Sequence, residues 1–84
     1  MENKFTVYIL YSEMINKYYV GYTSVTVEER LDRHLSNHKG YSAQTKDWKV
    51  VFTKEFDAKV EAMHLEKQIK SRGIRRYLMD IGMM

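Results

Sequence analysis

Apolar and polar residues alternate in two short runs near the start of the chain, residues 5–11 and 18–23. A period of two is typical of a β-strand, because successive side chains point to opposite faces of a sheet. The polar connector between the runs, residues 12–17, has a length that suits antiparallel neighbours better than a parallel crossover. We therefore expect the two runs to form a hairpin.

The same alternation divides the hairpin side chains between two faces. With the aliphatic side chains turned to a core, the opposite side carries Tyr8, Tyr19 and Gly21. A glycine inside a strand loses packing and backbone entropy, so it often marks a position where another group approaches closely. We interpret this side as the floor of a site. The alternative is ordinary packing, since tyrosine rings suit a half-buried sheet surface.

A helical pattern follows the hairpin. Thr26 and Glu29 match a capping box, in which each side chain satisfies a free amide of the first turn. Apolar residues then recur at intervals of four, and Arg30 and His34 form a neighbouring stripe. Gly40 is a typical stop signal. We expect a helix from residue 26 to about residue 39.

The pattern of apolar residues in the remainder of the chain predicts one more strand and a second long helix. Residues 48–56 alternate again, and their predicted common face holds Trp48, Val50 and Phe52. Asp57 is the expected N-cap of a helix that ends near Ser71. Its buried stripe is predicted to be Ala58, Ala62, Leu65 and Ile69. Together these elements predict an α+β fold, a small three-stranded antiparallel sheet flanked by helices.

Composition narrows the class of protein. The 84 residues suffice for one small domain, and we expect residues 1–84 to form a single domain. The absence of cysteine excludes disulfides and thiolate metal sites, and it fits a reducing compartment. No apolar run approaches the roughly 18 residues of a membrane span, and no signal-peptide pattern is present. We therefore expect a soluble, cytoplasmic protein that does not bind membranes.

Positive charge is concentrated in the last third of the chain. The net charge is +3, but residues 59–76 alone contain six cations and two anions. Clustered cations attract polyanions, and neutralised phosphates supply most of the non-specific affinity for nucleic acid. The alternative is a solvated, lysine-rich helix face. Nucleic acid is thus the partner that the charge pattern favours.

Two tripeptides stand in matching positions on the two hairpin strands. Thr6-Val7-Tyr8 lies on the first strand, and Tyr19-Val20-Gly21 follows on the second. This pair resembles the paired signature of the GIY-YIG nuclease superfamily, with Thr-Val in place of Gly-Ile. The likeness continues in order downstream with Arg30, His34 and Glu66. The likeness covers nearly the whole chain. The chain is similar to the small, stand-alone bacterial members of this superfamily, which are related to the nuclease domain of the excision-repair incision subunit.

The resemblance implies an endonuclease that hydrolyses DNA phosphodiester bonds in one step, with one Mg²⁺ or Mn²⁺ ion as cofactor and a structure-selective or repair-related substrate. By this resemblance, Tyr8 and Tyr19 position or activate the attacking water. Arg30 binds the scissile phosphate, His34 assists proton transfer, and Glu66 holds the metal. The expected nucleic-acid-binding residues are Gly21, Lys67, Lys70 and Arg72. A separate protein partner could supply targeting.

These roles agree with the chemistry of the side chains. Mg²⁺ keeps most of its waters and commonly takes one or two protein carboxylates, so Glu66 alone suffices in principle. Free tyrosine has a pKa near 10, so Tyr8 needs a nearby cation to act as a base at neutral pH. Arginine binds a phosphate through two parallel hydrogen bonds, which lysine does not.

Two other classes of function stay open at this point. A nucleic-acid-binding module on the same scaffold would bind without turnover, with Lys67, Lys70 and Arg72 more important than Glu66. A protein-interaction domain would use the basic face to meet an acidic partner. Glu66 could also be a surface residue that only pairs with Lys70, four residues later on the helix.

Overall fold

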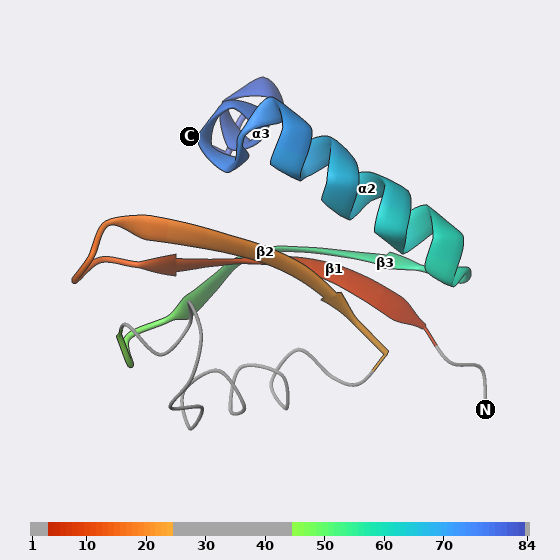
Figure 1. Cartoon of the computed structure of the whole chain (residues 1–84), viewed down its shortest axis with the longest axis horizontal. Helices are drawn as coiled ribbons and strands as arrows, with labels where there is room; N and C mark the ends of the chain where they lie inside the picture. The colour runs from red at the N-terminus through yellow and green to blue at the C-terminus, as the bar shows by residue number, and fades with distance from the viewer. Residues whose placement is uncertain (1–3, 25–44, 84) are drawn as a thin grey trace.

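A computed structural model of the chain describes residues 4–24 and 45–83. The described part contains the strands β1 (Phe5–Ser12), β2 (Lys17–Thr23) and β3 (Lys49–Phe56) and the helices α2 (Lys59–Arg72) and α3 (Ile74–Asp80). The sheet has the order β2-β1-β3, and β1 is antiparallel to both neighbours. α2 and α3 lie over one face of the sheet (Figure 1). The predicted α+β fold is confirmed.

The predicted hairpin is confirmed as the pair β1 and β2. Its register places Tyr8 opposite Gly21 and Leu10 opposite Tyr19. Asn16, the residue just before β2, has a φ of 52°, a left-handed conformation that asparagine tolerates better than most residues. The register thus brings the predicted site residues of the two strands together.

Two apolar clusters cover the two faces of β1, because its side chains alternate between them. The first cluster lies between the sheet and the helices and contains Val7, Ile9, Val20, Ala62, Ile69 and Leu78. The second cluster belongs to the opposite face and contains Tyr8, Leu10 and Trp48. Both faces of β1 are therefore buried, and the second cluster includes Tyr8 of the predicted site.

β3 contains a bulge that the sequence pattern does not reveal. Consecutive residues of β1 pair with Phe52 and Val50, so Val51 is an extra residue in β3. A bulge of this kind shifts the alternation of side chains on either side of it. The prediction that Trp48, Val50 and Phe52 share one face is therefore wrong. Trp48 belongs to the second cluster, Phe52 packs against the first, and Val50 is exposed.

The start of α2 also differs from the prediction. The helix begins at Lys59, and its N-cap residue is Ala58, which makes no side-chain cap hydrogen bond. Asp57 is not the N-cap; its carboxylate instead pairs with the ammonium of Lys4 at 2.5 Å. Ala58 has extended dihedral angles and is exposed, so it does not join the buried stripe. Within the described ranges, neither helix has the length and apolar character that a membrane crossing requires.

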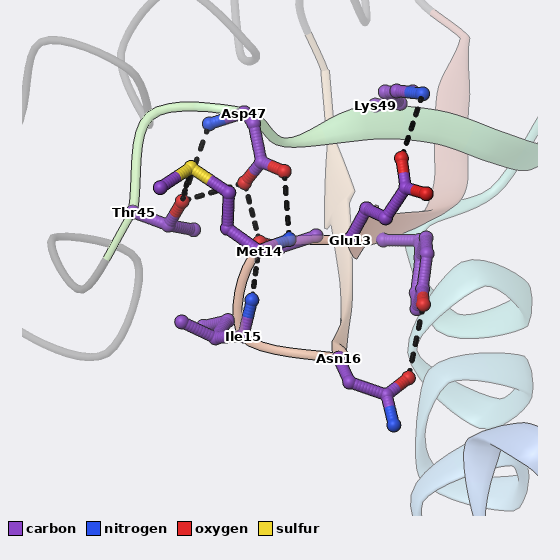
Figure 2. Close-up of polar contacts among 9 residues, drawn as sticks. Glu13, Met14, Ile15, Asn16, Thr45, Asp47 and Lys49 are labelled. Atoms are coloured by element: carbon purple, nitrogen blue, oxygen red, sulfur yellow. Dashed lines mark hydrogen bonds and ion pairs between the residues drawn. The ribbon is translucent and has the colours of Figure 1, made fainter.

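Asp47 fixes the connector between β1 and β2 (Figure 2). Its carboxylate accepts hydrogen bonds from the hydroxyls of Ser12 and Thr45 and from the amide of Met14, the last at 3.0 Å. Each hydrogen bond stabilises the ionised carboxylate, and together they lower the pKa of Asp47 to about 2. A residue just before β3 thereby sets the shape of the hairpin.

Candidate active site

An open cleft of about 450 Å³ lies along β2, an outer strand of the described sheet. Its walls come from β1, β2 and one side of α2. The lining residues are Phe5, Tyr8, Tyr19, Val20, Gly21, Tyr22, Thr23, Ser24, Lys59, Glu66 and Lys70. The cleft therefore combines phenols, one carboxylate and two ammonium groups.

Tyr8 and Gly21 lie against each other on the floor of the cleft. A β-carbon at residue 21 would be 2.7 Å from the Tyr8 hydroxyl oxygen and 3.3 Å from Cε1 of Tyr19. Only a residue without a side chain leaves this space to the phenol. The close approach expected at Gly21 is therefore made by the Tyr8 side chain, and the absence of a side chain at residue 21 sets the position of its hydroxyl.

The rings of Tyr8 and Tyr19 are neighbours on this floor. Their centroids are 6.4 Å apart and their planes are tilted by 32°. Tyr19 also meets the edge of Trp48, with centroids 6.4 Å apart and an interplanar angle of 62°. Offset and edge contacts of this kind suit the quadrupoles of aromatic rings. Tyr8 is 1% exposed, so its ring is held by packing.

Glu66 enters the cleft from α2. Its side chain is 14% exposed, and its carboxylate accepts a hydrogen bond from the Lys70 ammonium at 2.6 Å. This hydrogen bond raises the pKa of Lys70, and Tyr19 adds a smaller electrostatic contribution in the same direction. The carboxylate is thus held in a partly buried position on the wall of the cleft that the phenols of Tyr8 and Tyr19 also line.

The donor atoms of the cleft fit a hydrated divalent cation. Among residues 4–24 and 45–83, no group of three or more His, Cys, Asp or Glu side chains could hold a metal ion. A site with several protein ligands is therefore not formed by this part of the chain. Mg²⁺ retains several waters and commonly takes one or two carboxylates, and Glu66 supplies one carboxylate in an open, polar cleft.

The structure groups some of the predicted site residues and separates others. Tyr8, Tyr19, Gly21, Glu66 and Lys70 share the cleft. Lys67 is exposed on α2 and does not line the cleft. Arg72 does not line it either, and its guanidinium forms two hydrogen bonds with Asp80 at 2.8 and 3.2 Å. Arg30 and His34 lie outside the described residues.

Lys59 is a cleft residue that the sequence-based prediction missed. It lies at the start of α2, seven residues before Glu66, which is four residues before Lys70. Residues at these intervals share one face of a helix. The spacing was visible in the sequence, but the face that α2 turns to the cleft was known only from the structure.

Comparisons with known proteins agree with this arrangement. The profile of the GIY-YIG catalytic domain matches residues 4–77. The chain is also similar to the UPF0213 protein BH0048 from Bacillus halodurans, known from a solution NMR structure. The two share 29% sequence identity with a TM-score of 0.57, over 93% of this chain and 82% of that chain. Curated proteins give no significant match.

Proposed function

Because the chain belongs to the GIY-YIG family of nucleases, we propose that its cleft hydrolyses phosphodiester bonds of DNA with one bound Mg²⁺ or Mn²⁺ ion. The observation that carries this proposal is the convergence of Tyr8, Tyr19 and Glu66 on one cleft. Hydrolysis of a phosphodiester needs a positioned water and neutralisation of charge on the phosphate oxygens. The cleft offers side chains for each of these tasks.

In this proposal, Tyr8 orients the attacking water and Tyr19 supports it. The Tyr8 ring is almost fully buried, so its hydroxyl has a fixed position at the cleft floor. A fixed donor and acceptor is suited to holding a water molecule in the orientation for attack. Tyr19 packs against both Tyr8 and Trp48, which limits the movement of its ring.

Glu66 is the residue that would hold the metal ion. Such an ion stabilises negative charge on the reacting phosphate and on the leaving oxygen. The Lys70 ammonium lies 2.6 Å from the Glu66 carboxylate, and it would supply a positive charge beside the phosphate once the metal ion has taken that carboxylate. Arg30 as phosphate ligand and His34 as proton-transfer residue remain proposals from the family resemblance.

The substrate and setting are proposed on the same basis. We expect DNA with a branched or damaged structure, in the cytoplasm, with a role in DNA repair. The described cleft is lined mainly by groups that suit backbone phosphates and a cation, which favours recognition of the sugar-phosphate backbone. A protein partner could direct the domain to its substrate.

The test is cleavage of labelled flaps, forks, junctions, single strands and duplexes, with and without Mg²⁺ or Mn²⁺. We expect metal-dependent cleavage that is lost in Tyr8→Phe and in Glu66→Gln. Glu61→Gln is the matched control for the carboxylate, because Glu61 lies on α2 outside the cleft. Tyr77→Phe is the control for the phenol, since Tyr77 packs against Phe52.

The outcome separates catalysis from simple binding. Cleavage that persists in both Tyr8→Phe and Glu66→Gln would overturn the assignment of the site. Salt-sensitive DNA binding without turnover by the wild-type protein would instead identify a binding module. Failure to bind any nucleic acid at low salt would favour a protein-interaction domain.

A further inference from the structure

Lys59, Glu66 and Lys70 line the same cleft from one face of α2. On the basis of the proposed function, we infer that Lys59 binds a backbone phosphate of the cleaved strand, a few nucleotides from the phosphate that reacts beside Glu66. The cleft would then guide one strand along α2. This assigns a DNA contact to a residue that the sequence pattern did not single out.

The Lys59 charge is available to a ligand. In residues 4–24 and 45–83, Lys59 forms no ion pair, whereas the other cleft lysine, Lys70, is bound to Glu66. Two other cations near α2 are also engaged within the protein. Arg72 pairs with Asp80, and Arg75 donates to Asn16. Lys59 is thus the lysine of the described cleft whose ammonium is not already paired.

The position of Lys59 makes a purely structural role unfavourable. It is the first residue of α2, where the helix dipole is positive. A cation at this end opposes the dipole, and the side chain is exposed, so it adds no core packing. Replacing Lys59 should therefore leave the stability of the fold unchanged or slightly higher. A loss of DNA affinity in such a variant would report on a lost contact.

The distance along the helix sets the expected position of the contacted phosphate. Lys59 precedes Glu66 by seven residues, which corresponds to about 10 Å at the α-helical rise. Each nucleotide of a B-form strand advances by about 3.4 Å along the duplex axis, and we take this axis to run parallel to α2. The Lys59 contact is therefore expected about three nucleotides from the scissile phosphate. Such a contact would be independent of sequence, because phosphates carry no base identity.

The first experiment measures binding to a fluorescent forked duplex in EDTA, which prevents metal-dependent cleavage. We compare the full chain with its Lys59→Gln and Lys46→Gln variants between about 50 and 200 mM salt. Loss of one phosphate contact lowers the slope of log K against log salt by about 0.7 to 0.9. Lys59→Gln should therefore lose about threefold more affinity, relative to wild type, at the low-salt end than at the high-salt end.

Lys46→Gln is a matched control, because it removes the same charge from an exposed position outside the cleft. We expect it to change the slope clearly less than Lys59→Gln does. Equal slopes for the two variants, or a wild-type slope for Lys59→Gln, would overturn the inference. Thermal unfolding of both variants tests whether any affinity loss comes from unfolding.

The second experiment places single neutral methylphosphonates along the labelled strand of a substrate that the wild-type protein cleaves. Neutralising the phosphate about three nucleotides from the cut should weaken wild-type binding but leave Lys59→Gln unchanged. An equal loss for both proteins at every position would contradict the contact. If the wild-type protein cleaves no DNA, the proposed function fails, and the salt comparison still decides the role of Lys59.

Discussion

The Tyr8 hydroxyl lies so close to Gly21 that a β-carbon at residue 21 would be 2.7 Å from it. Gly21→Ala should therefore displace the phenol that we propose to orient the attacking water. We expect cleavage to fall by about tenfold or more, because a misplacement of about 1 Å can cost about 100-fold in rate. Overpacking of this kind typically costs about 1 to 3 kcal/mol of stability. Urea unfolding and cleavage assays measure the two effects separately.

A double-mutant comparison isolates the contact between these residues. Tyr8→Phe removes the hydroxyl, which is the atom nearest to the added β-carbon. The destabilisation by Gly21→Ala should thus be smaller in the Tyr8→Phe background than in wild type. Additive losses of unfolding free energy would show that the hydroxyl is not what excludes a side chain at residue 21.

Lys70 and the proposed metal ion compete for the Glu66 carboxylate. Removal of the ammonium in Lys70→Ala should tighten binding of Mn²⁺, since a unit charge and a divalent ion about 4 Å apart repel by about 2 kcal/mol in water, or about thirtyfold in affinity. Mn²⁺ titration followed by electron paramagnetic resonance measures this directly. Lys67→Ala is the control, and tightening of the same size in that variant would contradict competition at Glu66.

The Lys70→Ala variant also tests how much the Glu66–Lys70 ion pair contributes to the free energy of unfolding. The Lys70 side chain is 59% exposed and the cleft beside Glu66 is open to water, so this pair should stabilise about as much as a helix-surface pair four residues apart, about 0.2 to 0.5 kcal/mol. The unfolding free energy of Lys70→Ala should therefore fall by no more than that amount. A larger fall in urea unfolding would mean that the Glu66–Lys70 pair has mainly a structural role.

The Asp47 carboxylate should make the stability of the fold depend on pH in the acid range. Its folded pKa of about 2 lies below the ordinary value of 3.8, because the folded state supplies three hydrogen bonds to the ionised form. The resulting stabilisation is complete above about pH 4 and is lost as the pH falls toward 2. Urea midpoints of wild type should decline more steeply over this interval than those of Asp47→Asn. Parallel declines would contradict this assignment.

Asn16 joins the hairpin connector to α3. Its side-chain oxygen accepts hydrogen bonds from the Tyr11 hydroxyl and from the Arg75 guanidinium, each at 2.9 Å. Asn16→Gly should lose both hydrogen bonds, and Asn16→Ala should lose about a further 1 kcal/mol because alanine disfavours the positive φ. Urea unfolding of the two variants measures the difference, and equal stabilities would mean that the φ of residue 16 adjusts.

The sequence predicted the hairpin and its two faces because alternation is a local property of β1 and β2. It did not predict the bulge at Val51, which depends on how β3 pairs with β1. Asp57 has the side chain of a typical N-cap, but its pairing with Lys4 comes from a distant part of the chain. Local patterns therefore placed the strands correctly and misassigned contacts that depend on tertiary structure.

The candidate site was predicted to a similar extent. The motif tyrosines and Glu66 were identified through the family resemblance, and they do share a cleft. The cations were harder to assign, because a cluster of charge in the sequence does not tell which side chains point the same way. Lys59 lines the cleft, Lys67 does not, and Arg72 is engaged by Asp80.

The aromatic ring of Tyr8 belongs to the second cluster, with Leu10 and Trp48, while its oxygen belongs to the cleft. A related chain that lacked the proposed cleavage activity would still need a ring of this size at residue 8 to remain folded. We therefore expect phenylalanine at this position in relatives that have lost the activity. A single oxygen atom would then distinguish an active relative from an inactive one.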